Sequence, residues 1–322
     1  MADEIKTIIG NETGYSAQLL RCGKLVAIPT ETVYGLAANA LEESAVLEIY
    51  KVKKRPRFNP LIIHVSGIEE IHKWVKDLPD TALKLAETFW PGPLTLLLPK
   101  SKLVPDLVTA GSDLVAIRVP DHPLTLELLK TIDFPLAAPS ANPSGYVSPT
   151  SVEHVYHHLK NEIPYILDGG PCKVGLESTI IGFNDEGKAI IHRHGGIEAE
   201  KIEEVTATRL IQPEIKQDHP STPGQLKSHY ATDTPLIIGR TSSINEKSFL
   251  IRFKEIDPGF SADRQRILSP SGSLEEAARN LFSILRELDE LKPDSIYVEK
   301  VPDHGLGIAI NDRLERAQHI LK

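Results

Sequence analysis

Residues 53–65 read KKRPRFNPLIIHV and join a helical pattern to a short apolar run. In the preceding residues 41–54, LEESAVLEIYKVKK, apolar side chains recur at helical spacing. Pro56 ends that pattern, and the pair Asn59-Pro60 makes a turn before the apolar residues of PLIIHVS. A helix, a rigid turn and a strand in direct succession indicate an α/β fold rather than an all-α fold.

The same alternation of helical patterns and apolar runs extends to both sides of this stretch. Strand candidates of the first part lie at residues 24–30, 94–99, 114–120, 135–140, 165–170, 178–183 and 189–194. From about residue 203 to 232 a polar, proline-containing segment interrupts the periodicity, as a linker does. A second α/β pattern then begins with a strand candidate at 234–239 and includes a helix whose capping box is Ser273 with Glu276.

A length of 322 residues agrees with two domains rather than one. The predicted boundaries are residues 1–205 for the first domain, 206–232 for the linker and 233–322 for the second α/β domain.

Composition and charge exclude several classes of protein. The formal net charge is -8, so the chain does not coat nucleic acid through bulk charge, and any contact with a polyanion must be local. Cys22 and Cys172 are far apart and support neither a disulfide framework nor a zinc site. Residues 1–14 lack a signal-peptide pattern and no run approaches about 18 apolar residues, so we expect a cytoplasmic protein.

The stretch KVKKRPR, residues 51–57, places five cationic side chains in seven positions of this acidic chain. Lys51, Lys53 and Lys54 would lie at the end of a helix, where each cation gains about 0.3–1 kcal/mol from the helix dipole. That role alone would explain the cluster. A cationic loop beside polar strand ends would also suit a small ligand that carries phosphates.

Polar side chains follow two of the apolar strand candidates. Thr30 and Thr32 follow one of them, and Ser140 and Asn142 follow another. Each of these side chains could serve ordinary turn chemistry, because hydroxyl and amide groups bond to nearby backbone. His64 lies inside an apolar strand, where a histidine is more often a satisfied core residue than a functional one. Together these side chains suggest one site built from strand ends.

Two arginines lie in apolar runs, and arginine is almost never buried without a partner. Arg118 in LVAIRVP could pair with a structural carboxylate such as Asp113 or Asp121. Arg193 in AIIHRH could do the same or, beside a Gly-Gly turn, could be exposed. Either guanidinium could instead bind an anionic ligand.

Standard nucleotide and metal motifs are incomplete. Residues 170–177, GPCKVGLE, have the glycine spacing of a phosphate-binding loop without its lysine and hydroxyl residues. His154, His157 and His158 share one face of a helix, but no matching carboxylate or cysteine cluster accompanies them. No metal ligand is therefore predicted.

These stretches, in this order, resemble the YrdC-like threonylcarbamoyl-adenylate synthases. The matching stretches are IPTETVYGLAANA, KKRPRFNPLIIHV, WPGPLTLLL, VAIRVP, PSANPSG, DGG, GLESTII and RHGGI. LSPSGSLEEAARNLFSILRELDE and GLGIAINDRLERA resemble the extra domain of the two-domain members. The resemblance covers nearly the whole chain. It implies a YrdC-like N-terminal domain with a twisted mixed sheet and helices, then a linker, then a smaller Rossmann-like α/β domain.

The resemblance implies ATP-dependent synthesis of L-threonylcarbamoyladenylate from L-threonine, bicarbonate and ATP, with release of pyrophosphate. The product would pass to a separate tRNA threonylcarbamoyl transferase complex for threonylcarbamoyladenosine modification at position 37 of tRNAs, and a weak direct contact with tRNA is possible. Mg²⁺ is expected with ATP.

The resemblance also assigns residues by matching motif. Catalytic roles fall on Lys53, Arg55, Ser140 and Asn142. ATP would be bound by Arg55, Asn59, Leu114, Ser140, Ser148, Arg193 and Tyr230. L-Threonine would be bound by Thr32, His64, Arg118, Ala138 and Ser178. Leu114 and Ala138 could contribute only backbone groups, and the linker stretch PGQLKSHYAT would bring Tyr230 over the nucleotide as part of a lid.

The chain departs from the family pattern at two places. His194 stands where the turn after Arg193 usually has proline, and Gln225 and Lys227 stand where methionine and tyrosine are common.

Two other functions are less compatible with the sequence than synthesis of L-threonylcarbamoyladenylate. An RNA-binding module without catalysis is disfavoured by an aromatic content of 6% and by the absence of a basic motif interleaved with aromatics. A YrdC-like enzyme that forms carbamoyl-adenylate is disfavoured because the C-x-x-C zinc motifs of such chains are missing.

Overall fold

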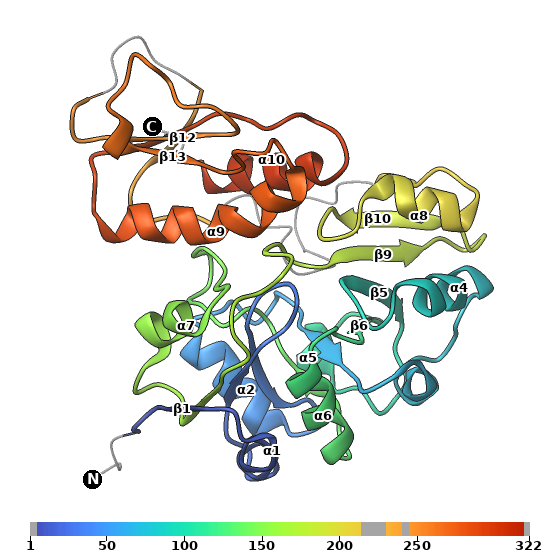
Figure 1. The fold of residues 1–322 in the computed structure, drawn as a ribbon. Helices are drawn as coiled ribbons and strands as arrows, with labels where there is room; N and C mark the ends of the chain where they lie inside the picture. The colour runs from blue at the N-terminus through green and yellow to red at the C-terminus, as the bar shows by residue number, and fades with distance from the viewer. Residues whose placement is uncertain (1–4, 214–229, 240–244, 319–322) are drawn as a thin grey trace.

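The structure is a computed structural model that describes residues 5–213, 230–239 and 245–318. Two separate sheets form the framework of these residues (Figure 1). The larger sheet has the strand order β1-β8-β2-β3-β7-β4-β6-β5-β9-β10 and mixes parallel with antiparallel pairs. The smaller sheet has the order β11-β14-β12-β13 and is parallel throughout. The predicted α/β class, with a mixed N-terminal sheet and a smaller second sheet, is confirmed.

Each apolar run predicted as a strand of the first part contains a strand of the larger sheet. The strands are β1 (Ile8–Gly10), β2 (Val26–Ile28), β3 (Gly35–Asn39), β4 (Ile62–His64), β5 (Leu94–Pro99), β6 (Leu114–Arg118), β7 (Leu136–Ala137), β8 (Tyr165–Leu167), β9 (Thr179–Phe183) and β10 (Ala189–Arg193). The helices are α1 (Thr13–Arg21), α2 (Glu43–Val52), α3 (Ile71–Trp74), α4 (Asp80–Phe89), α5 (Asp106–Thr109), α6 (Pro123–Thr131), α7 (Val152–Leu159) and α8 (Ala199–Thr206), with the 3-10 turn Ile68–Glu70. β1 and β3 were not predicted as separate strands.

The second unit contains the smaller sheet and two long helices. Its elements are β11 (Leu236–Ile238), β12 (Phe249–Arg252), β13 (Gln265–Ile267), β14 (Ile296–Val298), α9 (Leu274–Glu290) and α10 (Leu306–Ala317), with the 3-10 turn Ala262–Arg264. Among the described residues, no helix is long and apolar enough to cross a membrane.

The predicted start of α9 is correct, but its capping box is not complete. The Ser273 hydroxyl accepts a hydrogen bond from the backbone N–H of Glu276 at 3.2 Å, as an N-cap does. The Glu276 carboxylate, however, accepts hydrogen bonds from the hydroxyls of Ser269 and Ser271 instead of reaching back to residue 273. The serine-rich stretch before the helix supplies these closer donors.

The two units share one buried apolar cluster. Val33, Val147 and Leu176 of the first unit pack in this cluster with α9 and α10 of the second. Burial of apolar surface stabilises such a contact by roughly 25 cal/mol per Å². The second unit is therefore packed against the loops after β2, β7 and β8.

A buried arginine of α9 joins the units through backbone oxygens. Arg286 is 2% exposed, and its guanidinium donates to the carbonyl oxygens of Val147, Ser148 and His154. The group also lies 4.9 Å from the ring centroid of Tyr146, a cation–π geometry. Arg286 thereby holds the loop between β7 and α7 in one conformation.

We predict that Arg286→Met lowers the free energy of unfolding by about 2–4 kcal/mol, because buried carbonyl oxygens lose their donor. Urea unfolding followed by circular dichroism measures the change. Arg279→Met, an exposed position on the same helix, is the matched control and should change stability by less than about 0.5 kcal/mol. Equal effects of the two substitutions would contradict the role of Arg286 in the interface.

Candidate active site

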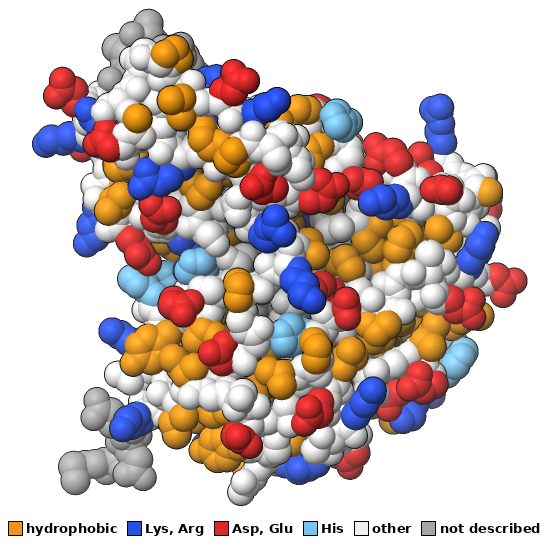
Figure 2. Space-filling view, viewed as in Figure 1, with side chains coloured by type: hydrophobic (Ala, Val, Ile, Leu, Met, Phe, Trp, Pro, Cys, Tyr) orange, Lys and Arg blue, Asp and Glu red, His pale blue; other side chains and the backbone are white. Residues whose placement is uncertain are grey.

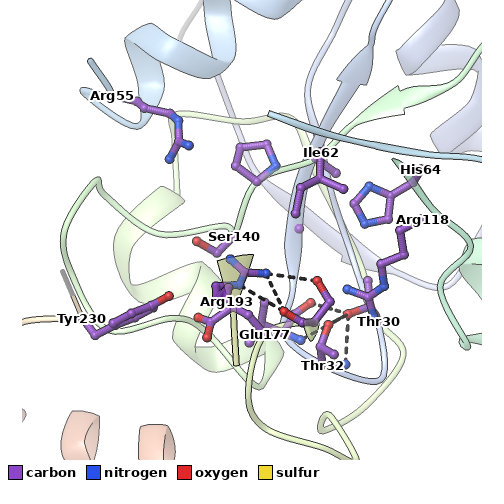
Figure 3. A pocket seen from close by; sticks show the side chains of 15 residues that line it. Thr30, Thr32, Arg55, Ile62, His64, Arg118, Ser140, Glu177, Arg193 and Tyr230 are labelled. Carbon is purple, nitrogen blue, oxygen red and sulfur yellow. Dashed lines mark hydrogen bonds between the residues drawn. The ribbon is translucent and has the colours of Figure 1, made fainter. Parts of the chain in front are cut away.

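A pocket lies where strand ends and loops of the larger sheet converge (Figure 3). Its lining residues are Thr30, Thr32, Val33, Gly35, Arg55, Ile62, His64, Arg118, Ala138, Pro139, Ser140, Glu177, Ser178, Arg193 and Tyr230. Three of these side chains are arginines and one is a carboxylate. The lining is therefore cationic and suited to an anionic ligand.

The sheet topology explains why residues distant in sequence meet there. β4 and β6 are parallel, and His64 is in register with Arg118. The carboxyl ends of parallel strands lie at the same edge of a sheet, so both side chains reach the pocket. β7 pairs with β4 as well and places Ala138 and Ser140 beside them.

The turn after β2 orients Thr32 toward the pocket. The Thr30 hydroxyl donates to the carbonyl oxygen of Val33 at 2.6 Å and lies 2.8 Å from the Thr32 hydroxyl. Because a hydroxyl has one proton to donate, Thr32 is the donor in the second contact. Thr30 therefore serves turn chemistry, whereas the lone pairs of Thr32 remain available to a ligand.

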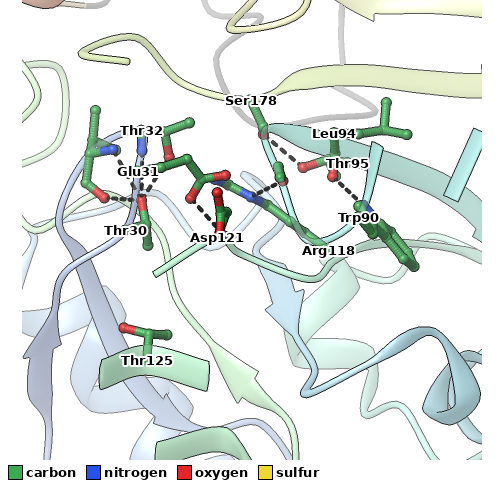
Figure 4. Close-up of polar contacts among 12 residues, drawn as sticks. Thr30, Glu31, Thr32, Trp90, Leu94, Thr95, Arg118, Asp121, Thr125 and Ser178 are labelled. Carbon is green, nitrogen blue, oxygen red and sulfur yellow. Dashed lines mark hydrogen bonds and ion pairs between the residues drawn. The ribbon is translucent and has the colours of Figure 1, made fainter. Parts of the chain in front are cut away.

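Arg118 has a partner that the sequence did not predict (Figure 4). Its Nη2 lies 2.7 Å from Oε1 of Glu31, and the two side chains are 4% and 5% exposed. Asp121, one of the predicted partners, contributes only its backbone N–H to the other Glu31 oxygen at 3.1 Å. The predicted pairing of Arg118 with Asp113 or Asp121 is wrong because the turn after β2, distant in sequence, brings Glu31 closer.

Arg193 is buried rather than exposed, and it fixes Ser178. Its guanidinium donates to the carbonyl oxygen of Ser178 at 2.9 and 3.0 Å and to its hydroxyl at 3.0 Å. The Ser178 hydroxyl also contacts the hydroxyl of Thr95 at 2.7 Å. Burial lowers the pKa of Arg193, yet arginine keeps its charge under physiological conditions.

The cationic stretch 51–57 divides into buried and exposed parts. Arg55 is 7% exposed, lines the pocket and donates to Oδ1 of Asn59 and to the carbonyl oxygen of Pro60, both at 2.7 Å. Asn59 thus orients Arg55 and is not itself among the lining residues. Lys51 and Arg57 are exposed.

Lys53 is buried behind the pocket wall. Its Nζ donates to the carbonyl oxygens of Ser140 and Asn142, both at 2.5 Å. Asn142 in turn donates its amide to the carbonyl oxygens of Pro143 and Tyr146. Lys53 and Asn142 therefore hold the loop that presents Ser140, and burial, with Arg55 and Arg286 nearby, lowers the pKa of Lys53. Neither residue lines the pocket.

Two further predicted residues lie outside the lining. Ser148 is fully buried and donates its hydroxyl to Oε1 of Glu177 at 2.6 Å. Leu114 begins β6, opposite Pro99, at the end of the strand remote from Arg118. The structure therefore does not bring Leu114 to the pocket.

Tyr230, a residue of the predicted linker that is 1% exposed, lines the pocket and contacts the second unit. Its ring is stacked on Phe282 of α9, with centroids 5.7 Å apart, and the guanidinium carbon of Arg313 lies 5.2 Å from its centroid. Residues 214–229, which include Gln225 and Lys227, lie outside the described residues, so the predicted lid is described only from Tyr230 onward.

The described part of the chain contains no dedicated metal centre. Within the described ranges, no cluster of three or more His, Cys, Asp or Glu residues could hold an ion. Glu177, a carboxylate of the pocket lining, already contacts Ser148 and Arg313 through its two oxygens. A Mg²⁺ ion that accompanies ATP would be held mainly by phosphate oxygens and water.

Fold and pocket define the protein as an α/β protein with a pocket, lined by three arginines, at the strand ends of a mixed sheet. The chain belongs to the Sua5_yciO_yrdC family, whose model, described as "Telomere recombination", matches residues 18–195. Residues 197–318 match the model described as "Threonylcarbamoyl-AMP synthase, C-terminal domain".

Relatives from an archaeon and a bacterium carry the name threonylcarbamoyl-AMP synthase. The protein from Pyrococcus abyssi is 42% identical over 94% of this chain and 92% of its own length. The protein from Bacillus subtilis is 40% identical over 98% of this chain and 95% of its own length. The crystal structure of P. abyssi Sua5 complexed with L-threonine matches with a TM-score of 0.87 and 40% identity, over 97% of both chains. The resemblance inferred from the sequence is therefore confirmed.

We predict that His64 makes stability fall as the pH is lowered. Burial, with Arg118 adjacent, lowers the pKa of His64 from 6.5 to about 3, so the folded state binds no proton there above pH 5. In the unfolded state His64 does bind a proton below a pKa of about 6.5. His64 therefore lowers the free energy of unfolding by about 2 kcal/mol between pH 7 and pH 5.

Urea unfolding of the wild type and of His64→Gln at both pH values measures this contribution. The loss of stability between pH 7 and pH 5 should be smaller in the variant by about 2 kcal/mol. Both proteins contain the same other ionisable groups, so the difference between them reports on residue 64. The same pH dependence in both would show that His64 is accessible to protons in the folded state.

Proposed function

We propose that this protein synthesises L-threonylcarbamoyladenylate from L-threonine, bicarbonate and ATP, and releases pyrophosphate. The observation that carries the proposal is the pocket itself, where three arginines meet hydroxyl groups and a neutral histidine. The P. abyssi relative, whose structure was determined with L-threonine, matches over the whole of this architecture.

Arg55 and Arg193 are suited to the ATP phosphates. Arg55 is held by neutral oxygens of Asn59 and Pro60, so its positive charge is not neutralised by a carboxylate of the wall. Charge develops on the α-phosphoryl oxygens and on departing pyrophosphate, and fixed cations stabilise it without reorganisation. Ser140 would donate a hydrogen bond beside them.

The other side of the pocket is suited to L-threonine. Arg118 would bind the amino acid carboxylate with the N–H groups that Glu31 and Gly92 leave free. Thr32, His64 and Ser178 would bond to the polar groups of threonine, and Ala138 would contribute its backbone. His64 is neutral, so it recognises a hydroxyl rather than adding a second cation.

The chemistry requires two balanced steps. The threonine amine and bicarbonate form a carbamate with loss of water, and the carbamate oxygen then attacks the α-phosphate as the bond to pyrophosphate breaks. Both the carbamate and the mixed anhydride are sensitive to water. The burial of Tyr230 at the pocket is consistent with protection of these species from solvent.

The metal ion, the downstream partner and the domain boundaries are proposed from the family resemblance. Mg²⁺ accompanies ATP, and the product passes to a tRNA threonylcarbamoyl transferase complex. We keep residues 1–205, 206–232 and 233–322 as the proposed catalytic domain, linker and second domain. An RNA-binding module is less well supported, because cationic and acidic side chains are interspersed over the face that Figure 2 shows.

We predict that purified protein releases pyrophosphate from MgATP only when both L-threonine and bicarbonate are present. A coupled pyrophosphate assay measures this dependence, with each substrate omitted in turn. Release without threonine, or no release by the folded protein, would contradict the proposed reaction. Binding of tRNA without ATP turnover would favour the RNA-binding alternative.

We predict that Arg55→Ala lowers kcat/KM at least about a hundredfold, which corresponds to a lost contact of about 2.8 kcal/mol in the transition state. Arg57→Ala is the matched control from the same loop, because Arg57 is exposed and should change the rate little. Steady-state pyrophosphate release measures both variants. Equal losses would mean that the cluster acts only as a diffuse charge.

A further inference from the structure

Arg313 connects the second unit to the pocket. It lies on α10, and its side chain is 0% exposed. Its Nε is 3.0 Å from Oε2 of Glu177, and its Nη1 donates to Oδ2 of Asp312 at 2.8 Å. The same guanidinium faces the ring of Tyr230 at 5.2 Å. One buried cation of the second unit therefore contacts two residues that line the pocket.

Glu177 needs this partner because of where its carboxylate lies. Among the described residues it is the single acidic side chain of the pocket lining, and it is 6% exposed. Ser148 occupies Oε1 but supplies no charge, and Arg313 forms an ion pair with this carboxylate, on which the charge of Arg193 also acts. A buried carboxylate without a paired cation would repel a nucleotide triphosphate that enters the same pocket, and the low dielectric of the interior would strengthen that repulsion.

The position of the Tyr230 ring also depends on the second unit. Its ring is stacked on Phe282 and faces Arg313, and both of these residues belong to the second unit. Arg313 thus acts on the pocket in two ways, through the charge of Glu177 and through the orientation of Tyr230.

We propose that Arg313 is a positioning residue for the nucleotide: from the second unit it neutralises Glu177 and orients Tyr230, so that the pocket accepts a polyanion. This inference rests on the proposed function for the identity of the polyanion as ATP. It gives the second unit a direct part in substrate binding, beyond packing against the first.

The test compares Arg313→Met, Glu177→Gln and the double variant. Isothermal titration calorimetry measures MgATP binding without the other substrates, and circular dichroism checks folding. Arg313→Met should weaken MgATP binding at least about tenfold, because it removes the ion-pair partner of the buried Glu177 carboxylate. Adding Glu177→Gln should restore affinity to within about threefold of the wild type, because the amide oxygen can still accept from Ser148 without carrying charge.

A second variant at position 313 and a control variant on the same helix separate the effect of charge from a loss of folding. Arg313→Lys retains the charge and should bind MgATP more tightly than Arg313→Met, even if the methionine variant folds poorly. Arg316→Met is the control on the same helix: Arg316 is 27% exposed, pairs with Asp312 at 2.9 Å and should leave binding unchanged.

Unchanged MgATP binding in Arg313→Met overturns the inference. A double variant as weak as the single one also overturns it, because the effect would then be structural rather than electrostatic. These results are distinct from failure of the proposed function. If the proposed function were wrong, wild-type protein would release no pyrophosphate with threonine and bicarbonate, whereas the comparison of MgATP binding would still report on Arg313.

Discussion

A guanidinium group cannot give up its water unless protein oxygens replace it, and this constraint shapes the region around the pocket. Arg55, Arg118 and Arg193 are each at most 9% exposed, and each is held by oxygens from a turn or a strand end. The turns position the arginines, and the hydrogen bonds of the arginines in turn fix the conformations of the turns. A pocket built in this way is organised before a ligand enters, which is what electrostatic catalysis requires.

The sequence predicted the α/β class and most strands, because apolar runs of strand length and their proline-rich ends are local features. It also placed Thr32, His64, Arg118 and Ser178 at one site through the family resemblance, and the structure brings these side chains together. Glu31 was missed although it lies in a quoted motif. Its pairing depends on how the turn after β2 meets β6, which no local pattern specifies.

The surface that covers the second unit could not be predicted from the sequence. Amphipathic spacing predicts that α9 buries one face, but not which surface covers it. In the structure the cover includes Val147 and Leu176 of the first unit, and Arg286 closes the contact through backbone oxygens. Two patterns that look independent in sequence therefore share one apolar cluster, although the first unit also has buried clusters of its own.

The partners of the arginines also divide the pocket by charge. Glu31 pairs with Arg118, so this corner is close to neutral overall and complements an amino acid, whose carboxylate and ammonium groups cancel. Arg55, in contrast, is held by carbonyl and amide oxygens that carry no formal charge, and it presents a net cation. A polyphosphate is attracted most strongly to such an uncompensated cation. The charges of the residues that hold the arginines thus support the proposed assignment of threonine to one side and ATP phosphates to the other.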